Sequence, residues 1–129
     1  MVQARMKELG IRAKESARFL MLASTEQKNA ALQAMARALV ARSEEILTAN
    51  QKDMEEGRKK CLSKTLLDRL MLSESRIKDM AEGLLALAAL PDPVGEVTEM
   101  YRRPNGLEVG QVRVPLGVVG IIYEARPNV

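Results

Sequence analysis

The stretch VPLGVVGIIYEARPNV, residues 114–129, decides which class of fold the chain belongs to. Its centre, GVVGIIY, is apolar at successive positions, so a strand there would have apolar side chains on both faces. Such a strand is typical of a buried parallel sheet that is covered by helices on each side. The stretch therefore predicts an α/β protein and indicates that the chain is the opening portion of a longer one.

The residues before this stretch predict a helical layer. Ser24 and Gln27 fit a capping box at the start of one helix, and Ser73 fits the N-cap of another. Gly57 and the basic run at 58–60 fit a helix end. Apolar residues recur at helical spacing over five segments, approximately residues 3–22, 24–42, 43–58, 63–71 and 73–90.

The pattern changes to that of strands after LPDPVGE, residues 90–96. Two runs with alternating polar and apolar residues, 95–103 and 107–114, are separated by a turn that contains Asn105 and Gly106. An Asn-Gly pair between two such runs is the strongest short-range signal for a β-hairpin. We therefore expect an antiparallel ribbon, followed by the buried strand.

Composition narrows the class of protein. Apolar residues make up 47% and charged residues 29%, which suits a globular domain with a solvated surface. The net charge of +3 comes from 20 basic and 17 acidic residues, which are interleaved, so nucleic-acid binding is not indicated. No apolar run reaches the roughly 18 residues of a membrane span. One cysteine and no histidine argue against a metal site, and we expect a cytoplasmic protein.

Two features before the terminal stretch have both a chemical and a structural interpretation. Cys61 follows Lys59 and Lys60, whose charge would favour a thiolate, but no histidine exists to act as its base. We therefore favour a cysteine that fills a small position after a helix end. The basic run at 58–60 could hold a phosphate, although a solvated helix terminus is the commoner arrangement.

The tip of the predicted terminal strand is the candidate site. Ligands of open α/β sheets bind beyond the carboxyl ends of parallel strands, where Tyr123, Glu124, Arg126 and Asn128 would lie. Arg126 could bind a phosphate or carboxylate with two hydrogen bonds, and the Asn128 amide could donate to a developing oxyanion. From the residues alone, a sheet end with ordinary polar side chains is an equally good interpretation.

The terminal stretch resembles the signature of the γ-glutamyl phosphate reductase family, within the aldehyde dehydrogenase superfamily. The resemblance extends to SEEILTANQKDMEEGRKK, residues 43–60, and to residues 62–97, from LSKTLLDRL to DPVGEV. These segments follow the order and spacing of the family. Cys61 is a departure, because relatives often have glycine before Leu62 and Ser63.

The resemblance implies an NADPH-dependent reduction of L-glutamyl 5-phosphate to L-glutamate 5-semialdehyde and phosphate, a step of proline biosynthesis with a functional link to glutamate 5-kinase. Family members use a cysteine thiolate that displaces phosphate and forms a thioester, which then takes hydride from the cofactor. That cysteine lies beyond residue 129, so we expect an N-terminal fragment that is inactive alone. The alternative is a helical protein-interaction module with a β-hairpin arm and no catalysis.

The resemblance also implies a division of the chain. Residues 1–94 would form the helical part of an NADP-binding domain, and residues 95–114 a hairpin ribbon that builds a homo-oligomer. Residues 115–129 would form the first buried core strand and a tip that faces the cofactor. The cofactor contacts implied at that tip are Ile122, Tyr123, Glu124 and Ala125.

Two residues share the chemistry that the resemblance implies at this tip. Many aldehyde dehydrogenases have an oxyanion-stabilising asparagine near the end of this strand. Alignment on Pro115 and Gly117 puts Arg126 at that position and Asn128 two residues later. The oxyanion role therefore stays open between the two, and Arg126 is the expected contact of the anionic acyl phosphate.

Overall fold

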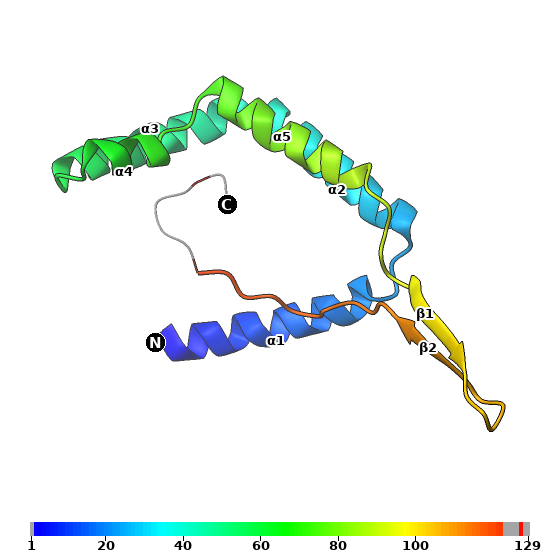
Figure 1. Cartoon of the computed structure of the whole chain (residues 1–129). Coiled ribbons are helices and arrows are strands. Elements are labelled where there is room, and N and C mark those ends of the chain that lie inside the picture. Colours follow the sequence, from blue (N-terminus) through cyan, green and yellow to red (C-terminus); the bar gives the residue numbers. More distant parts are fainter. Residues whose placement is uncertain (1, 123–126, 128–129) are drawn as a thin grey trace. The chain divides into compact units, whose positions relative to one another are not determined.

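The structure is a computed structural model that describes residues 2–122 and residue 127. Figure 1 shows the order of its elements along the chain. The chain divides into one compact unit formed by Met1–Thr25 with Pro91–Gly120 and a second formed by Glu26–Leu90 with Ile121–Val129. The described elements are α1 (Val2–Leu20), α2 (Thr25–Ala41), α3 (Ser43–Lys59), α4 (Lys64–Leu70), α5 (Glu74–Ala88), β1 (Val97–Arg102) and β2 (Glu108–Val112).

The second unit contains the core of the described chain. Its buried apolar side chains are Ala36 on α2, Met54 on α3, and Ile77 and Ala81 on α5. Ile77 is only 1% exposed and is the largest side chain that is fully buried among the described residues. Helix α3 packs against both α4 and α5. The alternation of apolar and polar residues at helical spacing therefore produces the packed layer that the sequence predicts.

The helix boundaries agree with the sequence prediction, Ser73 caps α5 as expected, and Ser63, which was not predicted as a cap, caps α4. The Ser63 hydroxyl accepts a hydrogen bond from the Leu66 amide at 3.3 Å at the start of α4. The Ser73 hydroxyl accepts one from the Arg76 amide at 3.2 Å at the start of α5. Each bond satisfies a backbone donor that the first turn of a helix leaves without a partner.

Helix α3 has acidic residues in its first turn, Glu44 and Glu45, and basic residues in its last turn, Arg58 and Lys59, which suits its dipole. At its start, the Arg42 guanidinium lies 2.7 Å from the Glu45 carboxylate, and this contact lowers the pKa of the Glu45 carboxyl. At its end, Lys60 lies 3.7 Å from Glu56, and both side chains are exposed. The basic run at 58–60 is therefore a solvated helix terminus in this structure, as the structural interpretation of the sequence favoured.

Cys61 closes the end of α3 in a left-handed backbone conformation, with φ of 55°. Its amide donates to the Arg58 carbonyl at 3.0 Å, and the Leu62 amide donates to the Gly57 carbonyl at 3.0 Å. This pair of bonds is the Schellman motif, in which glycine is the usual residue at the left-handed position. Cys61 is exposed, so the structure gives it a turn position and no buried reactive environment.

We expect Cys61→Gly to raise the free energy of unfolding by about 1 kcal/mol, because glycine adopts the left-handed region without the clash that a Cβ atom causes. Chemical denaturation followed by circular dichroism measures the change. Cys61→Ser is the matched control, since it removes the thiol but keeps the Cβ. A control that stabilises as much as the glycine variant would show that the thiol, and not the backbone, causes the effect.

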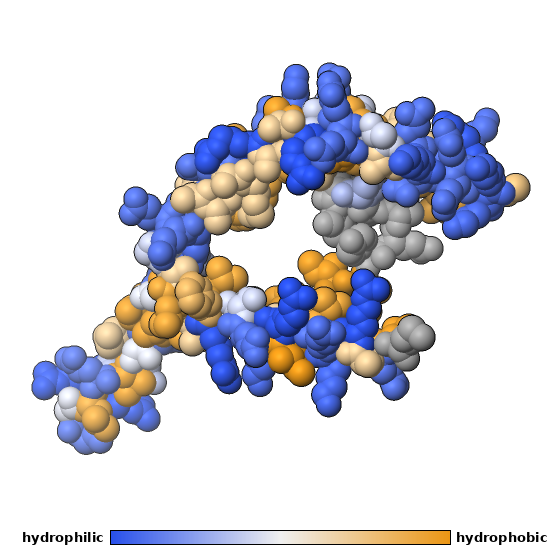
Figure 2. Space-filling model, turned by 180° about the vertical axis from the view of Figure 1, so that it is seen from behind, coloured by the Kyte–Doolittle hydropathy of each residue, from blue (hydrophilic) through white to orange (hydrophobic). Residues whose placement is uncertain are grey.

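The predicted hairpin is present in the first unit. Strands β1 and β2 pair antiparallel, with Met100 opposite Gly110 and Tyr101 opposite Val109. The turn places Gly106 at φ of 88°, and the Gly106 amide donates to the Arg103 carbonyl at 2.9 Å. All residues of both strands are exposed, and Figure 2 shows apolar side chains at the surface of this hairpin.

Residues 115–122 differ from the sequence prediction of a buried strand. They form no strand, and their apolar side chains are exposed, with Leu116 at 93% and Ile122 at 103%. The only paired strands among the described residues are β1 and β2, which pair with each other. A core strand needs neighbours that satisfy its backbone and cover its faces, and the described residues supply none. In the described chain this segment is therefore not a strand, and its burial as a core strand stays a prediction for a longer protein.

The first unit also contains α1 and the loop that follows α5. The Thr25 hydroxyl donates to the Asp92 carboxylate at 2.9 Å. Residues of α1 and of the segment after β2 line a hollow of about 400 Å³. Its lining residues are Gly10, Lys14, Ala17, Arg18, Met21, Pro115, Gly117 and Val118.

Within the described part of the chain, no helix combines the length and the apolar character that crossing a membrane requires.

Candidate functional site

Most of the residues that the sequence indicates as a site lie outside the described residues. These are Tyr123, Glu124, Ala125, Arg126 and Asn128. Of the predicted cofactor contacts, Ile122 alone is described, and its side chain is fully exposed. The roles inferred for this tip therefore stay predictions.

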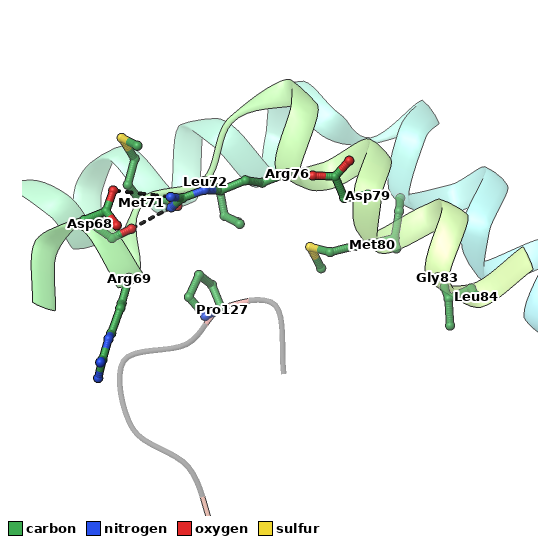
Figure 3. A pocket seen from close by; sticks show the side chains of 11 residues that line it. Asp68, Arg69, Met71, Leu72, Arg76, Asp79, Met80, Gly83, Leu84 and Pro127 are labelled. Atoms are coloured by element: carbon green, nitrogen blue, oxygen red, sulfur yellow. Dashed lines mark hydrogen bonds and ion pairs between the residues drawn. The ribbon is translucent and has the colours of Figure 1, made fainter. Parts of the chain in front are cut away.

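A hollow of about 730 Å³ lies at the junction of α4 and α5, within the second unit. Four of its lining residues are charged, namely Asp68 and Arg69 from α4 and Arg76 and Asp79 from α5. Figure 3 shows these side chains and Pro127 around the hollow. The other lining residues are Leu39, Met71, Leu72, Met80, Gly83 and Leu84.

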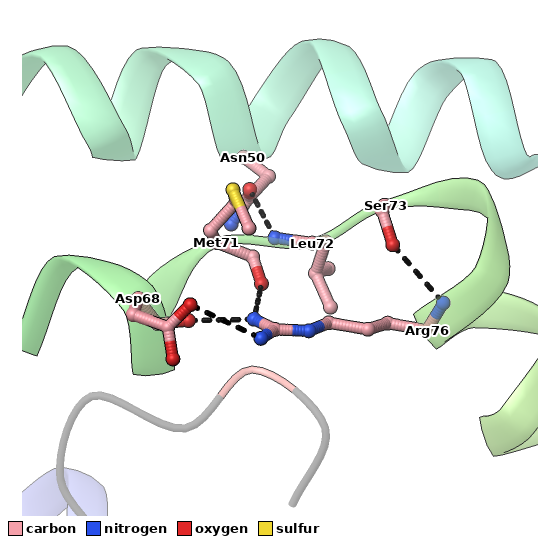
Figure 4. A network of polar contacts seen from close by, with 6 residues as sticks. All are labelled: Asn50, Asp68, Met71, Leu72, Ser73 and Arg76. Atoms are coloured by element: carbon pink, nitrogen blue, oxygen red, sulfur yellow. Dashed lines mark hydrogen bonds and ion pairs between the residues drawn. The ribbon is translucent and has the colours of Figure 1, made fainter. Parts of the chain in front are cut away.

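Arg76, in the first turn of α5, binds the end of α4. Its guanidinium donates to the backbone carbonyls of Asp68 and Met71, the latter at 2.6 Å, and lies 3.3 Å from the Asp68 carboxylate. Figure 4 shows these contacts converging on one side chain. Carbonyls at the end of a helix lack partners within the helix, so a guanidinium that binds them stabilises the junction.

Asn50, which lies on α3, stabilises the same junction between α4 and α5. Its side-chain amide donates to the Leu70 carbonyl at 2.8 Å. Its side-chain oxygen accepts from the Leu72 amide at 2.8 Å, as Figure 4 shows. Asn50 is 6% exposed and is the one buried polar residue of the described chain. The two bonds fix the backbone between α4 and α5, and with it one wall of the hollow.

Two of the four charged lining residues are not used by this network. In the described part of the chain, the side chains of Arg69 and Asp79 take part in no hydrogen bond or ion pair, whereas those of Arg76 and Asp68 bind each other. The hollow therefore offers one cation and one anion beside an apolar surface. Over the same residues there is no cluster of three or more acidic or cysteine side chains that could hold a metal ion.

Sequence reasoning missed this hollow. Arg69 and Asp79 fall at exposed positions of two predicted helices, where charged residues are expected in any soluble protein. The useful signal was the short connection between the helices, residues 71–73, which brings the two helix ends together. The short connection predicts that the end of α4 lies close to the start of α5, but it does not indicate which charged side chains there lack partners.

Comparisons with known proteins show extensive similarity over most of the chain. It is 68% identical over 120 residues to the γ-glutamyl phosphate reductase of Heliobacterium modesticaldum and 66% identical over 120 residues to that of Moorella thermoacetica. In both cases the match includes 93% of this chain, and the chain spans 29% of the length of the relative. No protein-family model matches the chain.

Two crystal structures are similar in fold and in sequence. The γ-glutamyl phosphate reductase of Thermotoga maritima superposes with a TM-score of 0.89 at 41% identity, over 94% of this chain and 29% of that one. The γ-glutamyl phosphate reductase of Saccharomyces cerevisiae superposes with a TM-score of 0.77 at 28% identity, over 84% of this chain and 28% of that one. These findings confirm the resemblance that the terminal stretch indicated and the α/β class with its hairpin.

Proposed function

We propose that this chain is the N-terminal part of a γ-glutamyl phosphate reductase, an oxidoreductase that converts L-glutamyl 5-phosphate and NADPH into L-glutamate 5-semialdehyde, phosphate and NADP in the cytoplasm. The observation that carries the proposal is the 68% identity over 120 residues to the Heliobacterium modesticaldum reductase. The chain spans 29% of that relative, so the activity belongs to a longer protein in which these residues take part. The chain alone is expected to be inactive.

The exposed apolar segment at 115–122 supports this proposal. Leu116 and Ile122 leave almost their whole side chains in water, and Val119 and Ile121 are 65% and 68% exposed. Burial of apolar surface is worth about 25 cal/mol per Å², so downstream strands that cover this segment would stabilise the longer protein considerably. In the proposed enzyme, this segment becomes the core strand that the sequence pattern predicts.

The cofactor that the proposal requires is NADP, which supplies or accepts the hydride when it is bound. Ile122 is the described member of the predicted contacts, and its apolar side chain suits contact with the flat face of a nicotinamide ring. Asn128 would stabilise the developing oxyanion, and Arg126 would bind the acyl phosphate.

The hairpin formed by β1 and β2 would contribute to a homo-oligomer. Its exposed apolar residues Met100 and Tyr101 support this role.

A chimera tests the proposed function. The stretch of the Heliobacterium modesticaldum reductase that matches this chain is replaced by the residues of this chain, and phosphate-dependent reduction of NADP by L-glutamate 5-semialdehyde is followed by absorbance. We expect activity within about tenfold of the parent enzyme and none from the 129-residue chain alone. A chimera that folds and assembles like its parent but lacks activity would contradict the proposal. Replacement of NADP by NAD tests the cofactor separately.

A further inference from the structure

We propose that Asn105, in the turn between β1 and β2, is a site of spontaneous deamidation, at which the Gly106 amide nitrogen attacks the side chain and the hairpin controls the rate. The proposal goes beyond the proposed function and does not depend on it, because it concerns the covalent chemistry of one turn. Both residues are exposed, and Asn105 is the only asparagine of the sequence that glycine follows. Figure 1 shows the turn at the tip of the hairpin.

The reaction needs only water in addition to the groups of the turn. The Gly106 nitrogen loses its proton to solvent and forms a bond to Cγ of Asn105. The bond from Cγ to Nδ2 breaks, and the amide group takes a proton from water and leaves as ammonia. Water then adds to one of the two carbonyls of the resulting cyclic imide and opens the ring, which gives aspartate or isoaspartate. Glycine hinders the attack least of all following residues, because it has no Cβ.

Two hydrogen bonds of the turn act on this reaction in opposite directions. The Leu107 amide donates to Oδ1 of Asn105 at 3.2 Å. A donor at this oxygen stabilises the negative charge that develops there during the attack, as the donors of an oxyanion hole do. The Gly106 amide, which supplies the attacking nitrogen, donates to the Arg103 carbonyl at 2.9 Å. The proton that has to leave is therefore held in the folded turn.

The restraint on the nitrogen decides the rate in the folded hairpin. The bond from Gly106 to Arg103, followed by a glycine at φ of 88°, fits a type I turn with a left-handed glycine after it. The residue at the position of Asn105 in such a turn has ψ of about 0°. This ψ directs the next nitrogen away from the side chain, so ring closure requires rotation of the peptide group. The attack therefore waits until the turn opens locally.

The hairpin provides few contacts that oppose this opening. All residues of β1 and β2 are exposed, and among the described residues each strand pairs only with the other. A two-stranded ribbon of this kind is marginally stable in water. The Arg103 amide closes the turn by donating to the Leu107 carbonyl at 2.8 Å. Folding therefore slows the deamidation without preventing it, and loss of the bond to Leu107 should accelerate it.

The test follows the chain by peptide mass spectrometry during incubation at a mildly alkaline pH. We expect the peptide that contains Asn105 to gain about one dalton, while the peptides that contain Asn29 and Asn50 stay unchanged. The product should include isoaspartate, which methylation by an isoaspartyl methyltransferase detects. In urea at the same pH, where the turn is unfolded, the rate should be about tenfold higher. Aspartate as the sole product would show direct hydrolysis and overturn the attack by Gly106.

Two variants of Arg103 separate the role of the turn from that of its charge. Arg103→Pro and Arg103→Ala both remove the guanidinium, which lies 5.8 Å from the centre of the Tyr101 ring. Only proline also removes the backbone N–H that donates to Leu107. We expect Arg103→Pro to deamidate about fivefold faster than Arg103→Ala in buffer, and both to react at the same rate in urea.

The remaining outcomes contradict the proposal at different points. Equal rates for the two variants in buffer, or equal rates for the unmodified chain in buffer and in urea, would overturn control by the hairpin. An Asn105 that stays intact in both solutions would overturn the site itself.

Discussion

Asn50→Ala is expected to lower the free energy of unfolding by about 3 kcal/mol, although it removes only a small polar side chain. The side chain is 6% exposed, donates to the Leu70 carbonyl and accepts from the Leu72 amide, each at 2.8 Å. Alanine would leave both backbone groups without partners at a partly buried site, and each such loss costs about 1–3 kcal/mol. Urea denaturation of the chain, followed by circular dichroism, measures the difference.

The matched control for this prediction is the next residue of α3. Gln51 is an exposed side-chain amide, and Gln51→Ala should change stability by less than about 0.5 kcal/mol. The control removes a similar amide and introduces the same residue in the same helix. If the two variants were equally stable, the bonds of Asn50 to the α4–α5 connection would contribute nothing to the free energy of unfolding. The network would then not hold the backbone at this wall of the hollow.

The sequence predicted local structure well because the signals for it are local. Ser73 precedes α5 as its capping residue, and Asn105 with Gly106 forms the hairpin turn. Each of these depends on residues within a few positions of one another. The left-handed position of Cys61 has a local signal too, since glycine is the usual residue at that position of a Schellman motif, but cysteine concealed it.

The parts that sequence reasoning missed depend on contacts between distant residues. Asn50 looked like an ordinary polar residue in a helix, since its partners lie about 20 positions later in the chain. Arg69 and Asp79 share a hollow because α4 and α5 meet end to end, which a helical pattern cannot indicate. The apolar pattern of residues 115–122 predicts burial, but it does not indicate whether the strands that would cover this segment are among the described residues.

Ile77→Ala is expected to lower the free energy of unfolding by about 3 kcal/mol, because it removes three methyl or methylene carbons from a fully buried site and leaves a cavity. Ile77 is 1% exposed on α5, in the helical unit where Met54 of α3 is also buried. Ile77→Val, which removes one carbon, should cost about 1 kcal/mol. The graded loss distinguishes a packing effect from a change in helix propensity, since alanine is the better helix former of the two.

The control for Ile77 lies on the same helix. Leu87 is 52% exposed, so Leu87→Ala should cost well under about 1 kcal/mol in the isolated chain, even though it removes as many carbons. Urea denaturation should show a lower midpoint for Ile77→Ala with an unchanged dependence on denaturant. Equal costs for the two alanine variants would mean that α5 does not use Ile77 to pack in the helical unit. The junction that presents Arg76 and Asp79 to the hollow would then need another source of stability.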